Sequence, residues 1–466
     1  MTTGSLAALL AAERAVSPPR TARALWELTW GQRGIYEHFR RNGFAMSAAA
    51  VTVLWRLPQP CEPAVVQAAL DHLVERHECL RTVYFDVSGA PLDPSNPAPT
   101  GRVRQQVEPA DTVPAHVVTC GPDEVEDYAA HLLRMADEEF SFDPQDVSAM
   151  RVVMIATGDG VVAVAGVISH MAVDSFGVTT LAQEFDHCVR RALAGRPFDG
   201  LPPARQPREL VADETTVTAA RANADTIRYF RSVLRDAPAR FVSSGRSRSQ
   251  LRASKVKGKS WTLQRSVDEI ARRSSTAAPT VLSALLTAQL AELTGESRVL
   301  LRTLHARRHW FSGVSYVAPH SLPSLMLLDV PPRFEDLLAA ARAAATTASS
   351  RADFDVCALN DLHAEKARAI GAALDGFILF NCWDMHVPAA DADIPPRPTE
   401  VEVWPQAGIL LDMQGEAAFW SQLEPGAIWV NFSCNEDLVG VDARTFLHHL
   451  EQFAASVADA PSSRLS

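Results

Sequence analysis

The feature that most constrains the fold is a pair of almost continuously apolar segments, residues 151–157 and 161–168. The residues between them, Gly158-Asp159-Gly160, tolerate the positive φ angles of a tight turn, so the two segments are predicted to pair as an antiparallel hairpin. Strands that are apolar on both sides belong in a sheet that is covered on both faces. Because the same turn interrupts the most apolar stretch of the chain, no membrane-spanning segment is predicted.

Strands and helices are expected to alternate along the chain, which is typical of an α/β fold with mixed sheets. Runs of β-branched and aromatic residues predict strands, and apolar residues at helical spacing predict helices. The expected strands lie near 50–57, 80–86, 102–107 (an edge strand), 298–304, 376–382, 407–413 and 427–433. The expected helices begin at Pro63 and near 177, and cover about 123–139, 217–235, 264–274, 280–293, 334–349 and 442–457.

Glycine and proline residues cluster between 195 and 215, which predicts a boundary between two lobes of similar size. We expect an N-terminal lobe at 20–190, a linker at 191–214 and a C-terminal lobe at 215–458. The length of 466 residues is compatible with two or three such units.

Composition excludes several classes of function. Asp and Glu (55) outnumber Lys and Arg (44), and the net charge of −11 disfavours general nucleic-acid binding. The seven cysteines are dispersed and show no metal-ligand spacing, so no metal site is predicted and the thiols are expected to be reduced, as in a cytoplasmic protein. The N-terminal residues lack the basic start of a signal peptide.

The most informative stretch reads Ile168-Ser169-His170-Met171-Ala172-Val173-Asp174-Ser175-Phe176-Gly177. It places a histidine where a buried strand ends and a helix begins, a position at which α/β proteins often hold reactive groups. Imidazole exchanges protons near neutral pH, so His170 is a candidate catalytic residue. Asp174 is predicted to orient the turn or to pair with a cation. Alternatively, His170 is a hydrogen-bonded histidine at a strand end without a catalytic role.

A second stretch, Arg76-His77-Glu78-Cys79-Leu80-Arg81-Thr82-Val83-Tyr84-Phe85, resembles the RHExLRTxF signature of the condensation domains of nonribosomal peptide synthetases. The SHxxxDS motif of residues 169–175 resembles the HHxxxDG active-site motif of the same family. Weaker similarities include Leu28-Thr29-Trp30-Gly31-Gln32, which is similar to LTxxQ, and Phe140-Ser141-Phe142-Asp143. The resemblance covers about residues 20–455.

The resemblance implies two lobes similar to chloramphenicol acetyltransferase, arranged as a V with a tunnel between them. In this family the tunnel admits the phosphopantetheine arms of carrier proteins, and the second histidine of the motif, here His170, assists attack of an amine or hydroxyl on an acyl thioester. We therefore expect a stand-alone condensation enzyme (an acyltransferase of antibiotic biosynthesis) that meets carrier proteins in trans. It would need no cofactor of its own and would use a carrier-bound or free acceptor.

The resemblance also implies a buried ion pair. Asp174 matches a structural aspartate that pairs, in the family, with an arginine from a Gly-Arg segment of the second lobe. The position of that arginine is taken here by Arg308, with Arg307 as its neighbour. This pair is expected to hold the active-site loop.

Two positions depart from the active-site motif: Ser169 replaces its first histidine and Ser175 its glycine. Together with Gly177 they are expected to shape the turn around His170. His320 replaces the asparagine of the family segment NTLPLR, so His320 and Ser321 either line the tunnel or lie in a loop without a catalytic role.

The sequence is compatible with two alternative functions and with further candidate sites. One is an acyl-CoA-dependent acyltransferase of the same superfamily, and another is a non-catalytic domain that binds carrier proteins or recruits a tailoring enzyme. The basic loop 240–259 is predicted to be solvated or to contact an acidic carrier protein or a pantetheine phosphate. Glu400 with Glu402, and His448 with His449, are predicted to be surface pairs.

Overall fold

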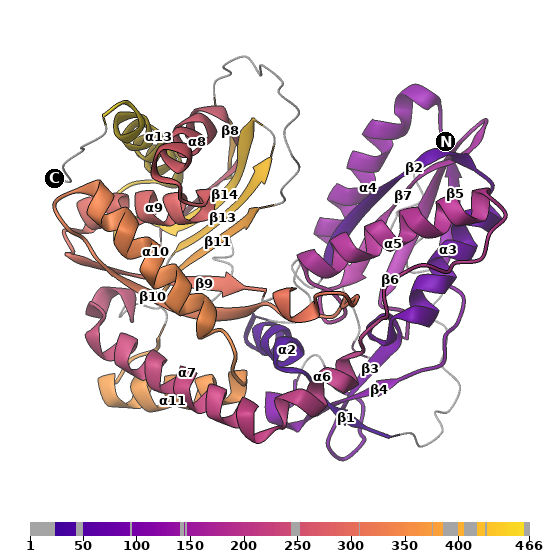
Figure 1. Ribbon diagram of the computed structural model, residues 1–466, viewed down its shortest axis with the longest axis horizontal. Coiled ribbons are helices and arrows are strands. Elements are labelled where there is room, and N and C mark those ends of the chain that lie inside the picture. The colour runs from indigo at the N-terminus through magenta and orange to yellow at the C-terminus, as the bar shows by residue number, and fades with distance from the viewer. Residues whose placement is uncertain are drawn as a thin grey trace. The chain divides into compact units, whose positions relative to one another are not determined.

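The computed structural model describes residues 24–42, 50–93, 96–139, 144, 147–243, 252–306, 308–374, 376–384, 399–404, 417–424 and 426–460. The chain divides into two compact units (Figure 1). Unit 1 comprises the residues up to Ala220 and two later segments, Ala306–Leu322 and Asp355–Cys357. Unit 2 comprises Arg221–His305, Pro323–Phe354 and the residues from Ala358 onward.

The division differs from the expected lobes in two respects. Residues 306–322 and 355–357 were expected in the C-terminal lobe but belong to unit 1. Within the expected linker 191–214, a helix, α6 (Pro207–Glu214), forms after Pro207 and buries Leu210 in unit 1. The boundary of unit 1, at Ala220, therefore lies beyond the cluster of glycine and proline residues that was expected to mark it.

The main sheet of unit 1 has the strand order β2-β7-β6-β5. Its centre is the predicted hairpin of β6 (Met150–Thr157) and β7 (Gly160–Ser169), and Gly160 adopts the positive φ of 125° in the turn. β7 also pairs antiparallel with β2 (Ala50–Cys61), whereas β5 (Ala115–Thr119) runs parallel to β6. β7 is thus an inner strand, and its last residue is fixed on both sides.

Helices cover both faces of this sheet, as its apolar strands predict (Figure 1). On one face α3 (Pro63–Arg76) and α5 (Ser175–Leu193) bury Leu70, Leu181 and Phe185 against the strands. On the other face α4 (Val125–Glu139) buries Leu132. The start of α5 therefore lies directly beside the end of β7.

A second, smaller sheet of unit 1 has the order β1-β4-β3. The strand expected at 102–107 is confirmed as β4 (Val103–Val107), but it lies between β1 (Trp26–Glu27) and β3 (Thr82–Asp86), so its expected edge position is wrong. β3 begins two residues later than expected, since Glu78–Arg81 form a 3-10 turn.

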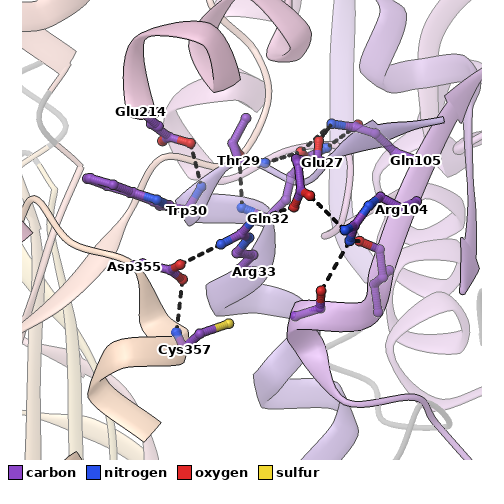
Figure 2. Close-up of polar contacts among 12 residues, drawn as sticks. Glu27, Thr29, Trp30, Gln32, Arg33, Arg104, Gln105, Glu214, Asp355 and Cys357 are labelled. Atoms are coloured by element: carbon purple, nitrogen blue, oxygen red, sulfur yellow. Dashed lines mark hydrogen bonds and ion pairs between the residues drawn. The ribbon is translucent and has the colours of Figure 1, made fainter. Parts of the chain in front are cut away.

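The first described helix, α2 (Trp30–Asn42), begins with a reciprocal cap that accounts for the LTxxQ segment. The backbone N–H of Gln32 donates to Thr29 Oγ1 at 3.1 Å, and the N–H of Thr29 donates to Gln32 Oε1 at 3.0 Å. The N–H of Trp30 donates to Glu214 Oε2 at 2.9 Å (Figure 2). Several of the orphan donors of the helix are thus satisfied by side chains.

Residues 355–357 are attached to unit 1 through α2. Figure 2 shows Arg33 between two carboxylates, with Nη2 at 2.6 Å from Glu27 Oε2 and Nη1 at 2.5 Å from Asp355 Oδ2. Asp355 in turn accepts a hydrogen bond from the N–H of Cys357 at 2.9 Å. A segment distant in sequence is therefore held to unit 1 by a charged network.

Unit 2 contains a seven-stranded sheet with the order β10-β9-β11-β13-β14-β8-β12. Its strands are β8 (Ala253–Ser260), β9 (Arg298–His305), β10 (Leu322–Asp329), β11 (Ile378–Asp384), β12 (Glu400–Trp404), β13 (Ala417–Glu424) and β14 (Ala427–Asn435). The helices α8 (Trp261–Ser274), α9 (Ala278–Thr294) and α13 (Ala443–Asp459) pack on the sheet, and α10 (Phe334–Ser350) packs on α9. The described residues also form α7 (Val217–Asp236) and α11 (Val356–Ile370), which both begin in unit 1 and continue in unit 2, and α12 (Glu436–Val439).

The largest correction in unit 2 concerns the basic segment. Residues 253–259 were expected to belong to the loop 240–259 but form most of β8, an inner strand between β14 and β12. Val256 is fully buried between Lys255 and Lys257, so the segment has the alternation of a strand despite its basic composition. The expected strand at 407–413 lies outside the described residues, and β10 and β13 were not expected at all.

The two predicted surface pairs lie on regular elements. Glu400 and Glu402 are exposed on β12, and His448 is exposed on α13 while His449 is half-buried. In the described part of the chain, no helix is both long and apolar enough to cross a membrane.

Candidate active site

The candidate catalytic histidine lies in the short loop between β7, which ends at Ser169, and α5, which begins at Ser175. The His170 side chain is half-buried, and its Nδ1 lies 2.7 Å from the carbonyl oxygen of Val173. A carbonyl oxygen can only accept, so this contact requires the proton of a neutral imidazole to be on Nδ1. The lone pair is then on Nε2, which is the tautomer that a proton acceptor or an orienting group needs.

Asp174 closes the loop and caps α5. It is 3% exposed, and its Oδ1 accepts from the N–H of Gly177 at 3.0 Å. Its Oδ2 accepts from the N–H of His320 at 3.0 Å and from Ser321 Oγ at 3.0 Å. Arg308 Nη2 also donates to Oδ1. The carboxylate thus joins the active-site loop to the segment 306–322 within unit 1.

The electrostatic balance at Asp174 favours the ionised form. Burial alone would raise the pKa of Asp174, but the charge of Arg308 and the N–H groups of His320 and Gly177 outweigh burial, and the pKa is lowered from its ordinary value. The buried carboxylate is consequently a permanent acceptor for its hydrogen-bond donors.

Arg308 is held by more than its ion pair. Its Nη1 donates to the carbonyl oxygen of Tyr316 at 2.7 Å. Its guanidinium carbon lies 5.7 Å from the ring centre of Phe176, 5.9 Å from that of Phe311 and 5.6 Å from that of Tyr316. Aromatic faces attract a cation at such distances, so the rings keep Arg308 directed at Asp174.

The structure brings the predicted pair Asp174–Arg308 together, although Arg308 belongs to unit 1 rather than to the second lobe from which it was expected. Its expected neighbour Arg307 lies outside the described residues, as does the segment Phe140–Asp143. The aromatic surroundings of Arg308 carried no recognisable sequence signal, because Phe176 and Phe311 are far apart along the chain.

The other predicted site residues take structural positions around the loop. Ser169 is buried and its Oγ accepts from the N–H of Met171 at 3.2 Å, while Ser175 is the half-buried first residue of α5. A Cβ on Gly177 would overlap the carbonyl oxygen of Val317 and lie 2.9 Å from its carbonyl carbon, so only glycine fits there.

His320 and Ser321 contribute to the site through Asp174. Ser321 donates its hydroxyl to Asp174, and His320 donates its backbone N–H. The His320 ring is 4% exposed and packs edge-on against Phe311, with ring centres 4.9 Å apart at 72°. Their proposed role in lining a tunnel stays a prediction.

The RHExLRTxF-like stretch forms a buried ionic cluster with α5. His77 is 1% exposed, and its Nε2 lies 2.6 Å from Glu184 Oε2. Arg76 Nε donates to the same oxygen at 3.1 Å. Glu78 pairs with Arg208 of α6 at 2.8 Å. These residues stabilise the packing of α3 against α5 and α6, and none of them contacts His170 through a described hydrogen bond.

Glu184 is expected to make stability depend on pH. Burial by itself raises the pKa of Glu184, but the hydrogen bond and charge of His77, with Ser315 and Arg76, lower it from 4.5 to about 2. A lowered pKa contributes stability above pH 4.5 that is lost as the pH falls toward 2, and the difference corresponds to about 3 kcal/mol at neutral pH. Urea denaturation between pH 7 and 3 should therefore show a shallower pH dependence for Glu184→Gln than for the wild type.

The matched control for this measurement is Glu126→Gln. Glu126 pairs with Arg56 at 2.5 Å, but its side chain is 69% exposed. An exposed pair contributes little, so this variant should follow the wild-type pH dependence. Parallel curves for Glu184→Gln and the wild type would refute the role of Glu184.

A cavity of about 500 Å³ lies in unit 1 beside α5. Its lining includes Phe176, Gln183 and Glu184 of α5, and Arg308 and Tyr316 of the segment 306–322. The cavity therefore reaches the ion pair that holds the active-site loop.

Comparisons with known proteins identify the class to which this fold and loop belong. Residues 24–366 match the family model described as "Condensation domain", so the chain belongs to the condensation-domain family. A comparison with curated protein sequences found no match.

Solved structures support the fold assignment. The X-domain from teicoplanin biosynthesis has a TM-score of 0.69 and 18% identity, and the match covers 96% of this chain and 98% of that one; this X-domain is also known in a complex with OxyB. A condensation domain that mediates chain release from the enacyloxin polyketide synthase has a TM-score of 0.68 and 17% identity, with 97% and 86% covered. The first condensation domain of the calcium-dependent antibiotic synthetase, in complex with a substrate analogue, has a TM-score of 0.68 and 16% identity, with 96% and 98% covered. The predicted fold class is therefore confirmed.

Proposed function

We propose that this chain joins a carrier-protein-bound acyl or aminoacyl thioester to an amine or hydroxyl acceptor, forming an amide or an ester. The observation that carries the proposal is the tautomer of His170, which its hydrogen bond to Val173 fixes. Its Nδ1 is engaged by the Val173 carbonyl, so that Nε2 can accept a hydrogen bond from a nucleophile. The loop that holds it is fixed to α5 and to residues 306–322 through Asp174.

The chemistry requires little from the protein beyond orientation and a proton acceptor. The nitrogen or oxygen of the acceptor attacks the thioester carbonyl carbon, and the carbon–sulfur bond breaks. The proton that the nucleophile loses passes to His170 Nε2 and then to the departing thiolate sulfur. A thioester is already activated, so fixing the two reactants accounts for most of the rate. The phosphopantetheine arm is part of the carrier-bound substrate.

The similar structures support this proposal in general terms. One of them is a condensation domain that mediates chain release, and another binds a substrate analogue in an antibiotic synthetase. Both belong to natural-product assembly, which is the setting we propose for this chain.

A second candidate is a non-catalytic role in which the chain recruits a tailoring enzyme. One observation in its favour is that the X-domain of teicoplanin biosynthesis, which forms a complex with OxyB, is among the similar structures. In addition, Ser169 and Ser175 replace two positions of the active-site motif. The retention of His170 in a fixed tautomer favours the catalytic candidate.

Product formation separates the candidates. The purified full chain is incubated with acyl groups loaded on carrier protein or on coenzyme A, each with a panel of amines and alcohols, and products are identified by mass spectrometry. Amide or ester product from the carrier-bound donor supports the proposal. Product from acyl-CoA alone would instead support an acyl-CoA-dependent acyltransferase. Carrier binding without product across the panel would support the non-catalytic role.

A further inference from the structure

The loop around His170 is anchored in its middle as well as at its ends. Met171, the residue after His170, is 6% exposed, and both of its backbone polar groups bind side chains. Its N–H donates to Ser169 Oγ at 3.2 Å, and its carbonyl oxygen accepts from Tyr84 Oη at 3.2 Å. The two peptide groups that flank Met171 are therefore fixed in direction.

Of the two side chains that bind the backbone of Met171, Tyr84 is held in place more rigidly than Ser169. It lies on β3 within a small sheet, is 5% exposed and belongs to an apolar cluster that also contains Met171 and Tyr36. Burial raises the pKa of Tyr84, so its hydroxyl stays protonated and donates at any working pH. The rest of its ring is held by the cluster, so the hydroxyl has little freedom to move away from Met171.

The geometry connects this anchor to the imidazole. The peptide between His170 and Met171 carries the N–H that Ser169 holds, and the Val173 carbonyl that fixes His170 Nδ1 lies two residues beyond Met171. Rotation of either peptide group next to Met171 would move the imidazole away from the Val173 carbonyl. The hydroxyl of Tyr84 thus acts on His170 through the backbone.

We propose that Tyr84 and Ser169 form a clamp on Met171 that positions the His170 imidazole for the reaction. Both residues are departures from the family motifs: Tyr84 stands where RHExLRTxF has phenylalanine, and Ser169 stands where HHxxxDG has its first histidine. The two departures meet at one residue. Their catalytic consequence rests on the proposed function, whereas the clamp itself does not.

The test compares Tyr84→Phe, Ser169→Ala and the double variant in the full chain. The matched control is Tyr36→Phe, because the hydroxyl of Tyr36, in the same cluster, donates to the Ala98 carbonyl at 2.9 Å rather than to the Met171 carbonyl. Hydrogen exchange of residues 168–178, followed by mass spectrometry, should accelerate about tenfold in Tyr84→Phe and stay at the wild-type rate in Tyr36→Phe.

Two further readouts distinguish positioning from mere stabilisation. In Tyr84→Phe, carbethoxylation of His170 by diethyl pyrocarbonate should become severalfold slower, because the Nδ1–H hydrogen bond to the Val173 carbonyl keeps the nucleophilic lone pair on Nε2. The kcat of acyl transfer should fall about tenfold with KM unchanged, since the loss arises in the oriented complex. Because both anchors act on Met171, the double variant should lose less kcat than the product of the two single losses.

Each outcome decides the question. Unchanged exchange in Tyr84→Phe would overturn the clamp, and faster exchange with unchanged His170 reactivity would overturn the positioning role. If the wild type forms no product with any donor, the proposed function fails, while the exchange and His170 reactivity still decide whether the clamp exists.

Discussion

Replacement of His170 by alanine is expected to lower the kcat of acyl transfer by about 10²–10⁴-fold, which is the usual contribution of a positioned acid–base group. The variant loses Nε2, the acceptor that the Val173 contact leaves available on the imidazole. The ion pair between Asp174 and Arg308 stays intact, so the melting temperature should not change. Rates with carrier-bound donor, measured at saturating acceptor, give the kcat directly.

A second substitution separates proton transfer from orientation. Asparagine at position 170 keeps an N–H donor for the Val173 carbonyl but has no basic nitrogen. An equal loss in His170→Asn and His170→Ala would indicate proton transfer, and a smaller loss in His170→Asn would indicate orientation. His448→Ala, which removes an exposed histidine of α13, is the matched control and should retain wild-type kcat. Full activity in purified His170→Ala would refute the assignment.

Local sequence patterns predicted the parts of the fold that depend on neighbouring residues. The hairpin of β6 and β7 was predicted because a turn that tolerates positive φ separates two apolar strands. The junction of β7 and α5 followed from the change from an apolar run to helical spacing. β8 was missed because its inward positions are small or single apolar residues among lysines, so composition concealed the alternation.

The candidate site required contacts that a sequence pattern does not contain. The pairing of Asp174 with Arg308 was expected only from the resemblance to condensation domains, since the two residues are 134 positions apart. The partner of Arg76 and His77 was not expected, because nothing in the sequence distinguishes Glu184 from Asp186, the other acidic residue of α5. Tyr84 was also missed: its hydroxyl has a partner only once the small sheet lies against the His170 loop.

The membership of residues 306–322 in unit 1 also depends on contacts that a sequence pattern does not contain. An arginine on this segment was expected to come from the other lobe. The segment belongs to unit 1 because Arg308, His320 and Ser321 all donate to Asp174 of the active-site loop. Gly177 is explained in the same way, because Val317 approaches its Cα from this segment.

Replacement of Asp174 by alanine is expected to destabilise the chain by about 3–5 kcal/mol, since it leaves the buried cation of Arg308 without its counter-ion. The side chain of Arg308 is 17% exposed and that of Asp174 is 4% exposed, so water compensates little. The substitution also removes the acceptor for the N–H groups of Gly177 and His320. For a unit of this size the loss corresponds to a fall in melting temperature of roughly 6–20 °C.

The ion pair itself is isolated by a double-mutant cycle with Arg308→Gln. If the two charges stabilise each other, the double variant Asp174→Ala/Arg308→Gln should lose about 1–3 kcal/mol less than the sum of the single losses. Asp225→Ala is the matched control, because its pair with Arg228 is exposed and should contribute less than about 1 kcal/mol. Strictly additive losses would mean that Asp174 stabilises the loop through its hydrogen bonds with Gly177, His320 and Ser321 rather than through its charge. Because Arg308 also packs against three aromatic rings, its own substitution is expected to be costly in either case.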